Sequence, residues 1–177
     1  MSTNSNQIDD LQRHSAELEY ATLRAEILKR IEMRQQIVSI ALTFAGIFLG
    51  FGLENDSLAL IYPPIAMFLA LSWSQNDFRI RDQARYIREK LETAMPGLGY
   101  ETFVQEKRLE AGGMRSWRFV VLSHGGLFLV TQVIAIGIEL SKFTLNTLDW
   151  VLLALDIIAV MIVIWLMIGS GRKTQRY

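Results

Sequence analysis

The chain alternates long apolar runs with strongly charged segments. Apolar runs occupy residues 37–53, 58–74, 119–138 and 150–168, and nearly every charged side chain lies between or outside them. An α-helix rises about 1.5 Å per residue, so about 20 residues cross the roughly 30 Å of hydrocarbon in a bilayer. The pattern predicts an all-α protein, an integral membrane four-helix bundle made of two transmembrane hairpins, residues 37–74 and 119–168.

Helical periodicity continues beyond the first hairpin in both directions, through residues 11–36 and into residues 75–118. Apolar side chains recur there at spacings of three and four, which is typical of an amphipathic helix with one buried face. The four-residue linker 54–57 forces spans 1 and 2 to be antiparallel, so their cytoplasmic extensions emerge side by side. We expect the two stripes to bury each other as a short coiled-coil stalk. The stripes are Tyr20, Leu23, Ile27 and Ile31 on the first extension, and Ile80, Ala84, Ile87 and Leu91 on the second.

Polar and helix-breaking residues mark the remaining boundaries. Residues 1–10 are polar and are expected to form a disordered tail, and residues 169–177 a cytoplasmic tail. Met95-Pro96-Gly97 should stop the second extension, before a third helix at 101–110. The Tyr62-Pro63-Pro64 motif either kinks span 2 or starts it; we favour a kink near the external face, with a re-entrant hairpin as the alternative to two full crossings.

The basic residues set the expected orientation. Of the 18 Lys and Arg residues, all except Lys142 lie before span 1, between spans 2 and 3, or after span 4. The positive-inside rule therefore predicts that both termini and the middle segment are cytoplasmic. Eighteen Asp and Glu residues balance the formal charge to zero, which argues against nucleic acid as a partner. We expect the lipid bilayer, a second copy of the chain and a cytoplasmic protein as partners.

Small residues recur along spans 1 and 2. In lipid, small side chains let two helix backbones approach closely, and the motif Gly46-x-x-x-Gly50 is of this kind. The favoured interpretation is packing of span 1 on span 2; a subunit interface or a pore lining is the alternative. The stripes are Ser39, Thr43, Gly46 and Gly50 on span 1, and Ala59, Pro63, Ala66 and Ala70 on span 2.

Two titratable side chains, Asp156 and His124, fall inside the apolar runs. Such residues are either functional or satisfied by polar neighbours within the bundle. Counting residues from the external ends of spans 3 and 4 puts Asp156 level with Gln132, and His124 much nearer the cytoplasmic face. We therefore expect Asp156 to face the bundle and to hydrogen-bond Gln132 or Thr131 as a neutral acid.

Motifs for conventional chemistry are absent from the sequence. It contains no cysteine, no GxxxxGK[ST], no HExxH and no GxSxG, and so offers no thiolate metal site, phosphate-binding loop or serine nucleophile. We accordingly expect no enzymatic activity, no cofactor and no bound metal.

Several segments resemble a group of small bacterial four-span membrane proteins of uncharacterised function. The likeness rests on EYATLRAEILKRIEMRQQ at 19–36 and on YPP, SWSQNDFRIRDQARYIREKLE and PGLGYE within 62–101. The resemblance implies a four-span topology in a bacterial inner membrane and carries no activity. In architecture the chain also resembles small membrane effectors of antiphage systems.

Two functional hypotheses follow. The leading one is a non-enzymatic, self-associating membrane protein that couples its cytoplasmic stalk to the bundle, as an effector or partner-binding subunit would. The alternative is a small transporter or channel that uses Asp156 and His124. It would match the small multidrug-resistance transporters in span count, although it lacks their acidic residue in span 1.

Overall fold

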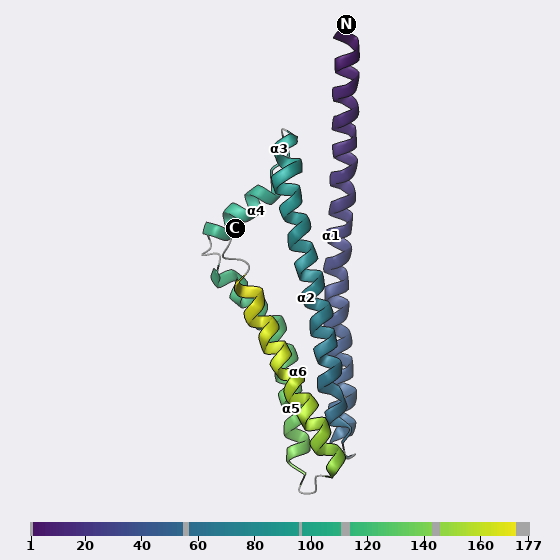
Figure 1. Ribbon diagram of the computed structural model, residues 1–177, viewed down its shortest axis with the longest axis vertical. Helices are drawn as coiled ribbons and strands as arrows, with labels where there is room; N and C mark the ends of the chain where they lie inside the picture. Colours follow the sequence, from purple (N-terminus) through teal and green to yellow (C-terminus); the bar gives the residue numbers. More distant parts are fainter. Residues whose placement is uncertain (1, 55–56, 96, 111–113, 143–145, 173–177) are drawn as a thin grey trace. The chain divides into compact units, whose positions relative to one another are not determined.

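The computed structural model is helical throughout the residues that it describes (Figure 1). It describes the backbone of residues 2–54, 57–95, 97–110, 114–142 and 146–172, and the side chains of these except at 2–9, 108, 114–124 and 169–172. The α-helices are α1 Ser2–Gly52, α2 Tyr62–Tyr86, α3 Glu92–Ala94, α4 Tyr100–Glu110, α5 Met114–Leu140 and α6 Thr147–Arg172. A π-helical turn, Ile87–Leu91, joins α2 to α3.

The longest helix, α1, runs for 51 residues without a break. It begins at Ser2, so the disordered tail expected for residues 1–10 is instead the first turns of this helix. The reason is local: residues 2–10 contain neither glycine nor proline, so nothing in the backbone stops the helix from extending beyond Leu11.

Helix α2 starts at the proline pair and does not kink there. A 3₁₀ turn, Ala59–Ile61, leads directly into α2 at Tyr62, which places Pro63 and Pro64 in the first helical turn. Backbone N–H groups in a first turn have no intrahelical acceptor, so a proline costs nothing at that position. The kink that we favoured from the sequence was therefore wrong.

The helix that continues from α2 ends where the sequence predicts. The last helical residue is Ala94, and Met95 has an extended backbone, the conformation favoured immediately before a proline. Gly97 then adopts a φ of 105°, in the left-handed region that glycine enters without steric cost. This turn leads into α4, the third helix expected in this segment.

The chain divides into two compact units. Unit 1 comprises Met1–Arg34 and Asn76–Gly113, and unit 2 comprises Gln35–Gln75 and Met114–Tyr177. In unit 1, Ile27 of α1 is buried with Ile87, Leu91 and Met95, and Tyr20, Leu23 and Ile80 pack against this cluster. Ala84 is half-buried outside the cluster, and Ile31 is exposed, so it does not belong to the buried stripe as we expected.

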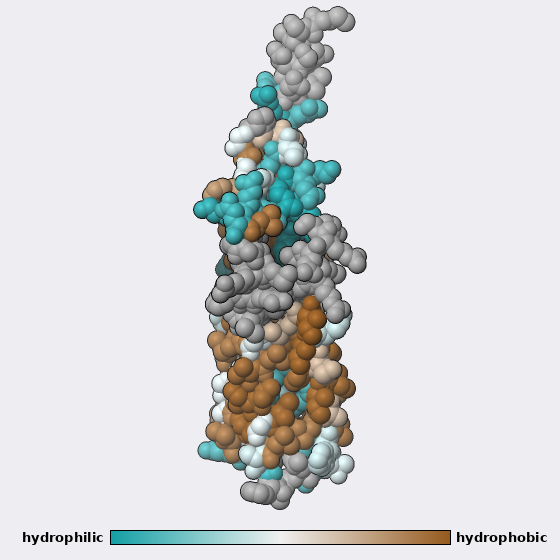
Figure 2. Space-filling model, turned by 90° about the vertical axis from the view of Figure 1, so that its left-hand side faces the viewer, coloured by the Kyte–Doolittle hydropathy of each residue, from teal (hydrophilic) through white to brown (hydrophobic). Residues whose placement is uncertain are grey.

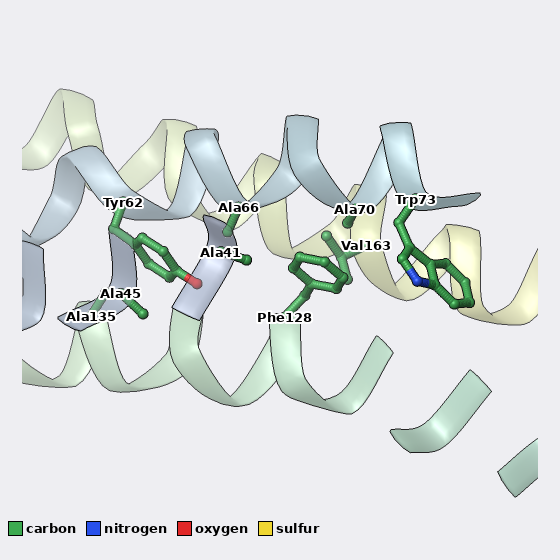
Figure 3. Packing of buried hydrophobic residues seen from close by; sticks show 9 residues of the cluster. All are labelled: Ala41, Ala45, Tyr62, Ala66, Ala70, Trp73, Phe128, Ala135 and Val163. Carbon is green, nitrogen blue, oxygen red and sulfur yellow. The ribbon is translucent and has the colours of Figure 1, made fainter. Parts of the chain in front are cut away.

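The core of unit 2 draws on four helices (Figure 3). Tyr62 of α2 and Phe128 of α5 are the large buried aromatic side chains near its centre. Alanines fill the positions where helices approach most closely, as expected for interhelical contacts without voids. The cluster consists of Ala41 and Ala45 from α1, Tyr62, Ala66, Ala70 and Trp73 from α2, Phe128 and Ala135 from α5, and Val163 from α6.

Unit 2 exposes apolar side chains on a large scale, and the face shown in Figure 2 is predominantly hydrophobic there. By length and composition, two helical stretches can cross a membrane, Asp10–Gly52 and Thr147–Ile168, and Gly125–Leu140 is a shorter apolar helix. The exposed large apolar residues of α6 are Leu148, Trp150, Val151, Leu155, Ile157, Ile158, Met161, Ile164, Trp165 and Ile168.

Candidate functional site

Four polar side chains are buried at matched positions on α5 and α6. Gln132 and Glu139 are seven residues apart on α5, and Asp149 and Asp156 are seven residues apart on α6. Seven residues make nearly two helical turns, so each pair lies on one face of its helix. The exposed fractions are 0% for Gln132, Asp149 and Asp156 and 1% for Glu139. We call Glu139 with Asp149 the loop-end layer, and Gln132 with Asp156 the mid-helix layer.

Ser57 connects the two acids of the loop-end layer. Its backbone N–H donates to Glu139 Oε1 at 3.1 Å, and its hydroxyl donates to Asp149 Oδ1. Ser57 has a φ of 63°, a left-handed conformation that costs a non-glycine residue free energy. That conformation aims both donors of one residue at carboxylates on two different helices.

The remaining oxygens of the loop-end layer are also satisfied. Lys142 Nζ donates to Glu139 Oε2 at 3.1 Å, and the backbone N–H of Asn146 donates to Asp149 Oδ2 at 2.7 Å. All four carboxylate oxygens thus accept a hydrogen bond, which is what burial of two acids requires. The layer ties the segment before α2 to the end of α5 and the start of α6.

In the mid-helix layer the available donors point toward α2. Gln132 Nε2 donates to the carbonyl oxygen of Pro63 at 3.1 Å. The Tyr62 hydroxyl donates to Thr131 Oγ1 at 2.8 Å, and the Thr131 hydroxyl in turn donates to the carbonyl oxygen of Leu127 at 2.9 Å. The first turn of α2 is therefore held on α5 by two side-chain hydrogen bonds.

Asp156 faces the interior without a hydrogen-bond partner. Both of its carboxylate oxygens, and Gln132 Oε1, are buried and accept no hydrogen bond from the described residues. The expected bond from Gln132 or Thr131 to Asp156 is not formed: the Gln132 amide donates to Pro63 of α2, and the Thr131 hydroxyl donates to the backbone of α5. The side chain of His124, the other titratable candidate from the apolar runs, lies outside the described residues.

The small residues of α1 do not contact the bundle as we expected. Ser39, Thr43, Gly46 and Gly50 are all exposed, and a Cβ built on either glycine meets no atom within 4 Å. A neighbouring stripe is buried in their place, formed by Ala41, Ala45 and Gly52.

At Gly52 the approach is close enough to exclude a side chain. A Cβ there would lie 2.7 Å from the Cβ of Ala59, in the turn that precedes α2. On the opposite side of this contact, Ala59, Pro63, Ala66 and Ala70 are all buried. The second small-residue stripe therefore lies inside unit 2, facing alanines and not the Gly46-x-x-x-Gly50 motif.

Unit 1 contains a second set of interlocking side chains, at the start of α4. Glu92 accepts hydrogen bonds from the backbone N–H groups of Glu101 at 2.6 Å and Thr102 at 2.9 Å, and from the Thr102 hydroxyl at 2.6 Å. Arg24 of α1 pairs with Glu101 and lies 4.6 Å from the centre of the Tyr100 ring. The first turn of α4 is thus fixed to α1 and α3 by charge-assisted contacts.

These contacts shift the pKa of Glu92. Partial burial raises the pKa of its carboxyl, but the bonds from Thr102 and from the two backbone N–H groups, together with the positive charge of Arg24, outweigh burial and hold the pKa below its ordinary value of 4.5. Glu92 is therefore ionised in the folded protein at neutral pH.

Ion pairs also connect α1 with α2 in unit 1. Arg34 pairs with Asp77, which also pairs with Arg81 at 2.8 Å.

Among the described residues, no group of three or more His, Asp or Glu side chains could hold a metal ion. Compared with known proteins, the chain matches no protein-family model, no curated protein and no solved structure.

Proposed function

We propose that the chain is a non-enzymatic, four-span protein of the bacterial inner membrane that acts as an effector or partner-binding subunit. The observation that carries this proposal is the surface of unit 2, which is lined with Leu, Ile, Val, Phe and Trp around a core that is itself largely apolar. Exposed apolar surface on this scale requires lipid or another protein. The spans would be the C-terminal part of α1, residues 58–74, α5 and α6.

The cytoplasmic stalk supplies the partner-binding module in this proposal. Helix α1 contributes residues to both units, as does the chain that runs from α2 to α3. An unbroken helix is stiff, so a displacement of unit 1 by a bound partner would be transmitted along α1 into the bundle. The basic residues flanking the spans support a cytoplasmic position for unit 1 and for both termini.

Self-association is supported by the small residues that the bundle leaves exposed. Gly46 and Gly50 present a surface without side chains on the outside of α1, with Thr43 about one turn and Ser39 about two turns before Gly46. Helices in lipid associate through such surfaces because close backbone approach maximises van der Waals contact. We propose that this face of α1 packs on the same face of a second copy.

A matched set of glycine variants tests self-association. Gly46→Ile with Gly50→Ile adds side chains where the protomer leaves space, so the fold should persist while dimers in lipid nanodiscs weaken at least tenfold. Gly52→Ala is the control, because its new Cβ meets Ala59; it should destabilise the protomer by about 1–3 kcal/mol without acting on the exposed face. Unchanged subunit stoichiometry of the double variant, measured by light scattering, would rule out this interface.

The second candidate, a transporter or channel, is favoured by the unsatisfied carboxylate of Asp156. Buried acids without partners occur where ions or protons pass through a membrane protein. Reconstituted into liposomes, the chain should then conduct ions or protons, and Asp156→Asn should abolish the flux while assembly persists. Under the effector hypothesis, stalk variants such as Ile27→Asp impair function more than Asp156→Asn does.

A further inference from the structure

Among the described residues of unit 2, three buried oxygen atoms accept no hydrogen bond: the two carboxylate oxygens of Asp156 and Oε1 of Gln132. Both side chains are fully buried. Burying an amide oxygen without a donor is unfavourable, and burying an ionised carboxylate without a partner is far more so. The protein needs a donor or a cation at this level to remain folded.

Helix register places the three oxygens at one level of the bundle. Glu139 and Asp149 lie level with each other, because Ser57 bonds to both. Helices α5 and α6 run antiparallel and pack along each other. Moving seven residues along each helix, away from the loop that joins them, leads from Glu139 to Gln132 and from Asp149 to Asp156. This register puts the buried side chains of Gln132 and Asp156 at the same level of the bundle, on helices that pack against each other.

Among the described residues, no donor and no positive charge is bonded to these three oxygens. From α2, the Tyr62 hydroxyl donates to Thr131; from α5, Gln132 Nε2 donates to Pro63. The titratable groups on the same faces of α5 and α6 are Glu139 and Asp149, and both are acids. Lys142, the nearest base along these helices, is bound to Glu139.

We propose that Asp156 and Gln132 form a buried site for one proton, which the Asp156 carboxyl carries and donates to Gln132 Oε1. A single proton supplies the missing donor, satisfies Gln132 Oε1 and removes the buried negative charge. A site of this kind is independent of whether the protein binds a partner or transports a solute, so it goes beyond the proposed function. The site is a pair of one acid and one amide, set two helical turns below the loop-end layer.

Infrared spectroscopy of the protein in lipid nanodiscs at pH 7 tests the site. The carbonyl stretch of a protonated carboxyl is separate from that of a carboxylate, so the parent spectrum should contain a protonated-acid band. Asp156→Asn should eliminate this band. Gln132→Met should retain the band and shift its frequency, because the hydrogen bond to Oε1 is lost. Glu139→Gln is the matched control and should leave the band in place, since every oxygen of the loop-end acids already has a donor.

Three results would overturn the proposal. A parent spectrum without a protonated-carboxyl band at pH 7 shows that Asp156 is ionised, and this outcome requires no variant to fold. A band that appears only when sodium is replaced by choline shows that the site holds a sodium ion and not a proton. A band that survives Asp156→Asn in a correctly assembled bundle assigns the proton to a different acid.

Discussion

Ser57 combines an uncommon backbone conformation with hydrogen bonds to two buried acids. Its left-handed φ of 63° directs its N–H to Glu139 and its hydroxyl to Asp149. Glycine would adopt the same backbone freely but would have no hydroxyl, and alanine would lack the hydroxyl and still bear the conformational cost. The two contributions can therefore be separated by two substitutions at a single position.

We predict that Ser57→Ala is less stable than Ser57→Gly by roughly 1–2 kcal/mol, the cost of a left-handed backbone at a residue with a Cβ. Both variants leave an oxygen of Asp149 without its hydroxyl donor. The difference between their free energies of unfolding therefore isolates the cost of the left-handed backbone. Urea unfolding in mixed micelles, followed by tryptophan fluorescence, measures it. Equal midpoints for the two variants would mean that Ser57 does not adopt a left-handed conformation in the membrane.

Sequence reasoning identified three of the five described residues of unit 2 that are polar and buried: Thr131, Gln132 and Asp156. Asp156 is conspicuous as the one acid within the fourth apolar run, and counting residues from the span ends predicted that it lies level with Gln132. Glu139 and Asp149 lie at the ends of their runs, where charged residues are ordinarily exposed to water, so composition gave no reason to bury them. The available signal was their seven-residue spacing from Gln132 and Asp156. The left-handed conformation of Ser57 could not be predicted from the sequence, because serine is uncommon at positive φ.

At the scale of elements, neighbouring residues of α1 have opposite environments. Ile27 is buried against Ile87 and Leu91, whereas Leu28 is 66% exposed. Ile27→Asp should therefore open unit 1, because it buries a charge without a partner, whereas Leu28→Asp should leave the unit intact. Limited proteolysis within residues 11–36 and 75–95 reads out the difference. Equal cleavage of the two variants would contradict the packing of this cluster.

The attachment of α4 should depend on pH through Glu92. Its folded-state pKa is held below the ordinary value of 4.5, so its stabilising contribution is fully present above that pH. The contribution is lost as the pH falls through the folded-state pKa. We predict that the amides of Glu101 and Thr102, corrected for intrinsic exchange rates, lose protection between pH 5 and pH 3.

Glu92→Gln provides the control for this prediction. Its side chain retains one acceptor oxygen but cannot titrate, so protection of the two amides should be lower at pH 7 and should not change on acidification. Protection that is flat across this range in the parent protein, or a fall of equal size in Glu92→Gln, would show that a different acid controls the attachment of α4.

In α1, the periodic pattern of apolar residues predicts that a helix forms more reliably than it predicts which face of that helix is buried. Two stripes of small residues run side by side in residues 37–53, and both satisfy the requirement for close approach. The buried stripe contains Ala41 and Ala45, which contact the layer formed by Tyr62 and Phe128. The choice depends on the sizes of side chains on other helices, which the pattern of α1 by itself does not contain. In unit 1 the residues that pack against Ile27 are few and large. There the spacing of apolar residues at three and four positions predicted most of the buried side chains.

For the whole molecule, the decisive prediction is its orientation in the membrane. Seventeen of the 18 Lys and Arg residues lie in the segments that we assign to one side, so both termini and Gly97 should be cytoplasmic and Asn146 external.

The natural chain has no cysteine, so a single cysteine introduced at each position reports its own location. A membrane-impermeant maleimide added to intact cells should label position 146 and not position 97, and permeabilisation should make position 97 reactive. Both positions are exposed, so a failure to label reflects the membrane barrier and not burial. Labelling of position 97 in intact cells would place unit 1 outside the cell, and the hypothesis of a cytoplasmic partner would be lost with it.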